Sequence, residues 1–449
     1  MFNVKLNKFL YLIAFASYFL VCEARAKLFK ADEFYLDNGL RVIVNENHKA
    51  PIAKLMLWYK VGSMDEPVGK GGLAHLLEHL MFRGTSKVSG SGLNEIMLEN
   101  GIENNAFTNR DFTVYHALCD ISRLELVMAL EADRMSNLQI TDEAFSGEQK
   151  IVYQERQQRV ENNSQSRFSE EVSKILWLGT PYEHPVSGTL EEIKTLTKED
   201  AVNFYKNYYT PSNAVLVISG DINADQMKKL TEKYYGKIEN KNVSKRESFT
   251  FQNKENGSIL IKKQMPHIES RKISISYIIP SVLENPKAAF ALNLFSGYLG
   301  QSGNSYFQKN LVQKNKVLMA GSDLSVSSRG SGVFAVFALP LDNQDDKSCI
   351  ELLEKSISEA FKSLTQERLE KEKQKTLSGL VYIDDNPEDS AYIIGELASL
   401  GLSLNQIENY ADNIEAVTLE DIKTALMNML KSSKKVIAVL APKEAKGNE

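Results

Sequence analysis

Apolar and polar residues follow two spacings along the chain, one typical of strands and one typical of helices. Compact apolar runs rich in branched side chains predict buried strands, whereas longer segments with apolar residues three and four positions apart predict helices. The predicted strands are 40–44, 52–61, 258–261, 272–279 and 332–339, and the predicted helices are 121–137, 141–160, 285–299 and 347–363. Because strands and helices interleave throughout, the pattern predicts an α+β protein.

The pattern repeats once, at an offset of 221 residues. A Thr-x-Glu-Asp run stands at 197–200 and again at 418–421, and in each the Thr caps a helix whose positive first turn holds the acids. A helical segment follows both runs, and buried-strand runs come next at the same offset, at 214–218 and 435–439. Three features that share one offset predict two homologous α/β halves of about 210 residues each.

A polar segment separates these halves. Residues 237–257 are rich in Lys, Asn, Glu and Ser and contain few apolar residues, which is typical of a linker. We therefore divide the chain into an N-terminal half, 27–236, the linker 237–257, and a C-terminal half, 258–449.

The first 26 residues have the pattern of a secretory signal peptide. Lys5 and Lys8 precede an uncharged apolar stretch, 9–21, and Ala24-Arg25-Ala26 matches a small-x-small cleavage signal. The apolar stretch is shorter than the roughly 20 residues of a spanning helix, and no later segment is long and apolar enough to cross a membrane. We expect a secreted protein, periplasmic if it is bacterial, with retention of the segment as an anchor as the alternative.

Composition narrows the possibilities further. The chain is 43% hydrophobic and 25% charged, as in ordinary globular proteins, and its net charge of −5 argues against a nucleic-acid partner. Outside the signal segment the cysteines are Cys119 and Cys349, too few for a disulfide framework. The fold must therefore depend on its hydrophobic core.

The run His75-Leu76-Leu77-Glu78-His79 carries the clearest chemical signal in the chain. The segment 72–82 reads as a helix, on which residues four apart lie on one face, so two imidazoles there can bind one metal ion. Chance would produce about 0.01 runs of the form His-x-x-Glu-His in a chain of this composition. We therefore interpret His75 and His79 as zinc ligands.

Zinc needs a third protein ligand and an open fourth position for water. The remaining histidines are scattered along the chain, so carboxylates are better candidates. The predicted helix 141–160 carries Glu148 and Glu155, which two helical turns bring to nearly the same face. One of them can bind the metal while the other supports a ligand, and the spacing alone leaves both assignments open.

These motifs, taken with their surroundings, resemble the pitrilysin, insulysin and mitochondrial-processing-peptidase family of inverted-motif zinc peptidases, and its bacterial secreted branch in particular. The resemblance covers nearly all of 36–225 and thins in the C-terminal half. The residues that carry it are 61–66, 72–79, Phe82, Gly84, Thr85, 105–108, Thr113, Tyr115, Glu148, Glu155, 181–182, Pro185, Val186, Gly188, Tyr209, Pro211, 213–214 and 220–221.

The resemblance implies roles for these residues and a fold of duplicated α–β roll domains. It implies that His75, His79 and Glu155 bind one zinc ion per chain, that Glu148 supports the ligands, and that Glu78 is the general base. Family members bind an extended peptide along an edge strand, which here implies substrate contacts from Asn105, Ala106 and Phe107.

The C-terminal half departs from the family pattern. At the 221-residue offset, His75, Glu78 and His79 correspond to Ser296, Leu299 and Gly300, so we expect a single active centre. Full peptidases of the family supply an Arg and a Tyr from this half, and those positions fall on Leu311 and Leu318. No Arg lies in 304–322, and we interpret Tyr306, the one phenol there, as a core residue.

The sequence therefore favours a zinc endopeptidase that cleaves peptides or unfolded segments. Either a related subunit supplies the missing Arg and Tyr, or the chain acts without them, for instance as a homodimer. The alternative is a non-catalytic scaffold subunit of the same fold, although such subunits usually lose the metal motif, which this chain keeps.

Overall fold

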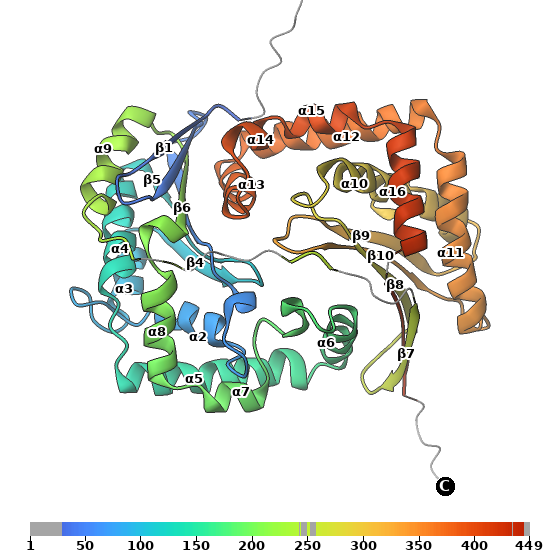
Figure 1. Cartoon of the computed structure of the whole chain (residues 1–449), viewed down its shortest axis with the longest axis horizontal. Coiled ribbons are helices and arrows are strands. Elements are labelled where there is room, and N and C mark those ends of the chain that lie inside the picture. Colours follow the sequence, from blue (N-terminus) through green and yellow to red (C-terminus); the bar gives the residue numbers. More distant parts are fainter. Residues whose placement is uncertain (1–28, 242, 244–248, 252–256, 433, 444–449) are drawn as a thin grey trace, which may run out of the picture.

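The computed structural model of this protein describes residues 29–241, 243, 249–251, 257–432 and 434–443. The predicted signal peptide lies outside these residues, as do 242, 244–248 and 252–256 of the predicted linker. Within the described residues, two β-sheets stand side by side, each with its own helices (Figure 1).

The N-terminal sheet has six strands in the order β1-β2-β6-β3-β5-β4. These strands are β1 (Ala31–Tyr35), β2 (Arg41–Glu46), β3 (Ile52–Tyr59), β4 (Glu103–Thr108), β5 (Thr113–Asp120) and β6 (Ala214–Gly220). The helices of this half are α2 (Leu73–Leu80), α3 (Gly92–Glu99), α4 (Leu124–Asn137), α5 (Asp142–Arg156), α6 (Ser164–Leu176), α7 (Leu190–Thr195), α8 (Lys198–Tyr208) and α9 (Ala224–Tyr235). Short 3₁₀ turns are η1 (Ser63–Asp65), η2 (Ile121–Arg123), η4 (Pro181–Glu183) and η5 (Pro211–Asn213), and η3 (Gln157–Glu161) is a π-helical turn.

The C-terminal sheet has five strands in the order β7-β11-β8-β10-β9. These are β7 (Ser258–Met265), β8 (Lys272–Ile279), β9 (Met319–Ser325), β10 (Gly332–Leu339) and β11 (Lys435–Pro442). The helices are α10 (Pro286–Gly300), the π-helical turn η6 (Gln308–Val312), α11 (Asp346–Ser363), α12 (Gln366–Asp385), α13 (Pro387–Ser399), α14 (Leu404–Glu408), α15 (Tyr410–Ala416) and α16 (Leu419–Ser432).

The two sheets share one topology, which confirms the predicted α+β class with two homologous halves. The strands β2, β6, β3, β5 and β4 occupy the same places as β7, β11, β8, β10 and β9. In both sheets one neighbouring pair, β2 with β6 or β7 with β11, is parallel, whereas the remaining pairs are antiparallel. The strands β6 and β11 begin at Ala214 and Lys435, the predicted offset of 221 residues apart.

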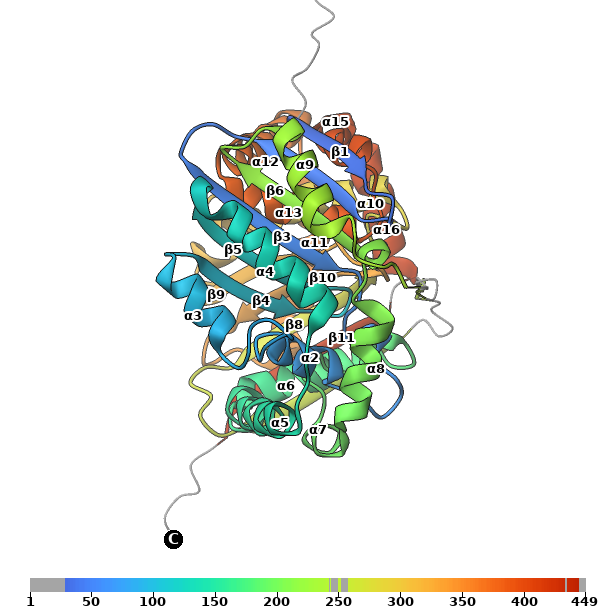
Figure 2. The same cartoon turned by 90° about the vertical axis from the view of Figure 1, so that its left-hand side faces the viewer.

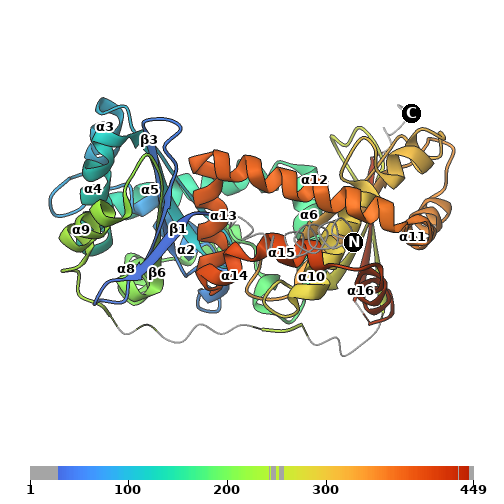
Figure 3. The same cartoon turned by 90° about the horizontal axis from the view of Figure 1, so that it is seen from above.

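One face of each sheet is covered by a helix from the other half. The helix α13 packs on β3 and β6 of the N-terminal sheet, and α6 packs on β7 and β11 of the C-terminal sheet. We call α6 and α13 the exchanged helices. The opposite face of the N-terminal sheet carries α4 and α9, which lie in front of it in Figure 2, and α12 crosses from one half to the other (Figure 3).

Apolar side chains hold each exchanged helix in place. Trp58 of β3 is fully buried under α13, together with Ala391 and Ile394 of that helix. Gly395 makes this approach possible, since a Cβ atom there would lie 2.0 Å from Trp58 Nε1. On the other sheet, Phe168 of α6 is buried beside apolar residues of β7 and β11. The N-terminal sheet is therefore covered by a helix of the C-terminal half, and the C-terminal sheet by a helix of the N-terminal half.

Part of the predicted linker also packs between the halves. Phe249 lies with its ring centroid 4.8 Å from that of Tyr182, and Phe251 donates its N–H to Ser331 Oγ at 3.1 Å. The linker and domain boundaries remain predictions, because much of 237–257 lies outside the described residues.

None of the helices in the described part combines the length and apolar character needed to span a bilayer. Cys119 and Cys349 are both buried free thiols. No disulfide between them therefore contributes to the fold, in line with the expected dependence on the core.

Replacing Gly395 with Ala tests how tightly α13 is packed. Ala normally favours a helix over Gly by about 1 kcal/mol, but here its methyl group would collide with Trp58. We expect Gly395→Ala to lower the free energy of unfolding by about 1–3 kcal/mol, measured by thermal and urea denaturation. Gly379→Ala in α12, where nothing lies within 4 Å of the added methyl, is the matched control and should stabilise or be neutral. Equal gains from both substitutions would contradict the packing described here.

Candidate metal centre

The helix α2 has one buried apolar face and one polar face. Its apolar side chains are buried in the N-terminal core, and they are Leu73, Ala74, Leu76, Leu77 and Leu80. His75, Glu78 and His79 occupy the remaining positions at the spacing i, i+3 and i+4, so all three project from the opposite face. The sequence predicts this helix to within two residues at each end.

Backbone contacts fix where α2 begins. Gly72 adopts a left-handed conformation with φ of 85°, and a Cβ atom there would lie 2.8 Å from the carbonyl oxygen of Ser187. The Glu66 carboxylate accepts hydrogen bonds from the N–H groups of Gly72 and Ala74, at 3.1 and 2.7 Å. Burial raises the pKa of Glu66 well above its usual range, and these two hydrogen bonds oppose that rise. The first turn of the helix is thereby held against the loop that contains Ser187.

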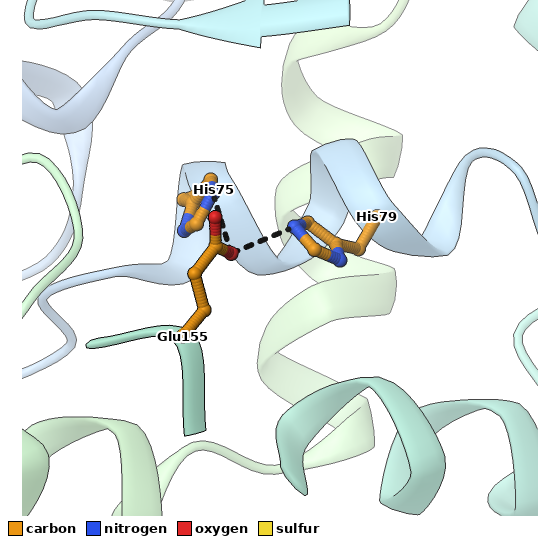
Figure 4. Close-up of side chains that lie close together, drawn as sticks. All are labelled: His75, His79 and Glu155. Atoms are coloured by element: carbon orange, nitrogen blue, oxygen red, sulfur yellow. Dashed lines mark ion pairs between the residues drawn. The ribbon is translucent and has the colours of Figure 1, made fainter. Parts of the chain in front are cut away.

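Glu155 approaches both histidines from α5. Its Oε2 atom lies 3.7 Å from His75 Nε2 and 3.5 Å from His79 Nε2 (Figure 4). One ligand atom from each of the three residues lies within 4.8 Å of the others. Ligand atoms at the usual zinc distances of about 2.0–2.1 Å are roughly 3.4 Å apart in a tetrahedral site. The three side chains therefore have nearly the separation that one zinc ion requires.

The unsatisfied polar atoms at this point also fit a metal ion. Glu155 Oε2 is buried and has no hydrogen-bond partner in the described part of the chain. Burial, followed by the nearby charge of His79, lowers the pKa of His75 to about 4, so its imidazole is neutral and able to bind metal near pH 7. A donor set of two imidazoles and one carboxylate is typical of catalytic zinc sites with an open fourth position.

Glu148 contacts His79 at Nδ1, the ring nitrogen that does not face Glu155. Its Oε2 lies 3.0 Å from His79 Nδ1, and its Oε1 accepts a hydrogen bond from Arg83 Nε. Burial raises the pKa of Glu148, but the bonds to His79 and Arg83 outweigh it and lower that pKa overall. When Nδ1 donates to Glu148, His79 Nε2 is left free toward Glu155. The structure thus brings Glu155 into the cluster with the histidines and leaves Glu148 outside it, a distinction that helical spacing left open.

Glu78 lies beside this cluster without joining it. Its Oε2 accepts a hydrogen bond from Thr108 Oγ1 at the end of β4. Burial raises the pKa of Glu78, and the bond from Thr108 opposes the rise. A buried carboxyl group with a raised pKa, next to a cluster of side chains that could hold a metal ion, is suited to accept and return a proton.

Three polar contacts of the centre were not assigned from the sequence. Arg83 holds Glu148, Thr108 holds Glu78, and Arg159 Nη1 lies 2.7 Å from Glu155 Oε1. Arg83 and Arg159 each follow a predicted site residue by four positions, so helical spacing could have indicated both. Thr108 comes from a separate strand and carries no such signal.

Cavities open on both sides of the cluster. One of about 450 Å³ is lined by His75, Glu155, Arg110, Arg156 and Arg159, among others. The other, of about 370 Å³, is lined by Glu78, His79, Phe82, Arg83, Asn94, Asn104, Asn105 and Glu148. We call them the arginine cavity and the Glu78 cavity. A chain passing over the cluster would extend into both.

The predicted substrate strand is the edge strand β4, which pairs only with β5 among the described strands. Ala106 packs toward the N-terminal core, on the same face of the strand as Thr108. Phe107 points the other way and contacts Trp58 and Tyr392 under α13. The exposed Asn105 accepts a hydrogen bond at Oδ1 from the N–H of Ala106. The strand is therefore available at its backbone, while the Phe107 side chain faces away from the cluster.

The C-terminal half contains no corresponding cluster among the described residues. Ser296, at the position equivalent to His75, is buried and donates to Ser322 Oγ. Leu311 is buried in the C-terminal core, whereas Leu318 is exposed. Tyr306 packs against the same core, as interpreted from the sequence, with its hydroxyl 3.5 Å from Glu359 Oε2.

Family models match both halves of the chain. Residues 41–190 match the model described as "Insulinase (Peptidase family M16)", and 195–376 match "Peptidase M16 inactive domain". The zinc protease PqqE of Helicobacter pylori is 27% identical over 397 residues, which is 87% of each chain. A probable mitochondrial-processing peptidase subunit beta of Schizosaccharomyces pombe is 31% identical over 217 residues, covering 48% of this chain and 47% of that one.

Solved structures share the fold. A protease from Helicobacter pylori superimposes with a TM-score of 0.83 at 24% identity, covering 92% of this chain and 100% of that one. The periplasmic protease PqqL from Escherichia coli gives a TM-score of 0.77 at 17% identity, covering 92% of this chain and 48% of that one. At these identities the likeness concerns the fold alone.

Removal of the carboxylate behind His79 should weaken metal binding. We expect Glu148→Gln to reduce zinc affinity roughly 10- to 100-fold, because His79 would lose the ionised acceptor that orients its ring. Affinity is measured by competition with a chromophoric chelator. Glu143→Gln, at an exposed position in the first turn of the same helix, is the control. Unchanged affinity in Glu148→Gln would show that this contact does not support the metal.

Proposed function

Because the chain belongs to the M16 family of peptidases, we propose that it is a zinc-dependent endopeptidase that hydrolyses peptides or unfolded segments. His75, His79 and Glu155 would hold one zinc ion, and Glu78 would act as general base. The observation that carries this proposal is the placement of Glu155 Oε2, which is buried, has no hydrogen-bond partner among the described residues, and lies 3.5–3.7 Å from both Nε2 atoms.

Bound zinc would lower the pKa of a coordinated water toward ~7 and polarise the scissile carbonyl group. Glu78 Oε1 or Oε2 would accept the proton of the attacking water and later deliver it to the leaving amine. The bond from Thr108 Oγ1 orients the Glu78 carboxylate, and burial favours its protonated form, which assists the first transfer, from the water to Glu78. Glu148 would keep His79 oriented throughout.

We propose that the substrate lies extended along the free edge of β4. Main-chain pairing with an edge strand gives affinity with little demand on sequence, and Asn105, Ala106 and Phe107 supply that backbone. Side chains of the substrate would then enter the arginine cavity and the Glu78 cavity on either side of the cluster.

The cellular setting is also a proposal. A cleaved signal at residues 1–26 would export the chain, to the periplasm in a bacterium. Leu311 and Leu318 leave the C-terminal half without the expected Arg and Tyr. A related subunit would supply them, as the word "subunit" in a relative's name suggests, or the chain would act without them, for instance as a homodimer.

The general base provides the sharpest test. We expect Glu78→Gln to lower kcat by about 10²–10⁴-fold while zinc content and thermal unfolding stay unchanged, because Glu78 does not belong to the ligand cluster. Turnover is measured on quenched fluorescent peptides. Glu99→Gln, an exposed acid on α3, is the control and should keep full activity. Activity that survives Glu78→Gln would overturn the proposed mechanism.

Metal content separates the peptidase from a non-catalytic scaffold of the same fold. We expect one zinc per chain by elemental analysis, loss of activity with 1,10-phenanthroline, and recovery on adding zinc, because the cluster offers three ligands. A purified chain that binds no zinc at micromolar concentration would favour the scaffold. Zinc binding without turnover, restored by a co-purifying related chain, would favour the heteromeric enzyme.

A further inference from the structure

Arg110 lines the arginine cavity and forms no ion pair among the described residues. It lies two residues beyond the end of β4 and lines the same cavity as His75 and Glu155. Its Nη2 donates to Ser173 Oγ at 2.9 Å, and its guanidinium lies 5.4 Å from the ring centroid of Tyr182. Its Nε is buried without a hydrogen-bond partner among the described residues. No carboxylate in that part of the chain forms an ion pair with it.

The other two arginines of this cavity are paired. Arg156 contacts Glu161 and Glu170 at 3.0 and 2.5 Å, and Arg159 contacts Glu155 at 2.7 Å. Glu183, a further acidic residue of the lining, accepts a hydrogen bond from the N–H of Gly179 and forms no ion pair with Arg110 among the described residues. Arg110 is thus the guanidinium in the cavity that remains able to receive a carboxylate from outside the protein.

A ligand carboxylate would relieve an unfavourable arrangement. Burial lowers the pKa of Arg110, and the nearby Tyr182 and Asp111 oppose this only in part, so the charged form gains from a further partner. A guanidinium presents a planar set of donors that matches a carboxylate, and charge-assisted hydrogen bonds of this kind are among the strongest in proteins. Hydroxyl groups of Ser169, Ser173 and Ser187 line the same cavity and can donate further hydrogen bonds.

The position of Glu78 indicates which part of a substrate reaches Arg110. In the proposed mechanism Glu78 delivers a proton to the leaving amine, so the segment C-terminal to the cleaved bond lies toward the Glu78 cavity. The segment N-terminal to that bond then extends past His75 and Glu155 into the arginine cavity.

We propose that Arg110 determines specificity by binding the carboxylate of an Asp or Glu residue on the N-terminal side of the scissile bond. The substrates would then be peptides that carry an acidic residue within a few positions before the cleaved bond. This inference rests on the proposed peptidase function and adds the class of substrate.

A peptide pool provides the first measurement. The zinc-loaded protein is incubated with an equimolar pool of randomised decapeptides, and mass spectrometry identifies the bonds that are cut. We expect Asp and Glu to be enriched about tenfold at one position before the cleaved bond, the size expected for a hydrogen-bonded ion pair. The enrichment should weaken at high salt, since screening acts on charge pairs.

Variants then assign the preference to Arg110. Matched peptides that differ only by Glu or Gln at that position are compared through their kcat/KM values. The Glu-to-Gln ratio should fall from about ten to near one in Arg110→Gln, and Arg110→Glu should prefer Lys in place of Glu. Arg123→Gln, an exposed arginine in η2 that lines none of the described cavities, is the control and should keep the ratio. Thermal unfolding checks that each variant is folded.

A binding measurement keeps the inference separate from the proposed activity. The zinc-loaded Glu78→Gln protein is mixed with the same pool, and the retained peptides are sequenced. If Glu78→Gln retains mainly acidic peptides but the parent protein cleaves none of the pool, only the peptidase proposal is contradicted. Cleavage or binding without acidic preference in the parent protein would overturn the role of Arg110, and so would a preference that persists in Arg110→Gln.

Discussion

Burial of the apolar face of α2 in the N-terminal core is the constraint on which the candidate centre depends. Five side chains of this helix are buried there, and they are Leu73, Ala74, Leu76, Leu77 and Leu80. Since the helix cannot rotate without exposing them, His75, Glu78 and His79 must project from its other face. Glu66 and the close contact at Gly72 fix the helix along its axis as well. The core therefore determines the geometry of the polar residues.

The exchanged helices connect this centre to the C-terminal half. The helix α6 follows α5, which carries Glu148 and Glu155, and packs on the C-terminal sheet. The helix α13 covers one face of the N-terminal sheet, and its Gly395 packs against Trp58 of β3. Residues of α6, including Ser169 and Ser173, also line the arginine cavity. The helix α6 thus both packs on the C-terminal sheet and lines the cavity beside the cluster.

The two halves keep one topology but differ in chemistry. In α2 the polar face carries His75 and His79, whereas the equivalent position in α10 is Ser296, which is buried and bonded to Ser322. Leu311, where the family pattern expects a polar residue, is likewise part of the C-terminal core. At Ser296 and Leu311 the C-terminal half therefore has buried residues that contribute to packing, and residues 195–376 match the family model described as an inactive domain.

The sequence by itself determined the α+β class, the 221-residue duplication and the helix that carries His75, Glu78 and His79, because periodicity and spacing are local properties of the chain. Helical spacing likewise put Glu148 and Glu155 on one face. Spacing left open which of the two approaches the histidines, and the family resemblance favoured Glu155, which the tertiary structure places beside them. Only the tertiary structure decided that Phe107 turns away from the cluster and that α6 and α13 are exchanged between the halves. These outcomes depend on distances between segments far apart in the chain, which are set by how the two cores pack together.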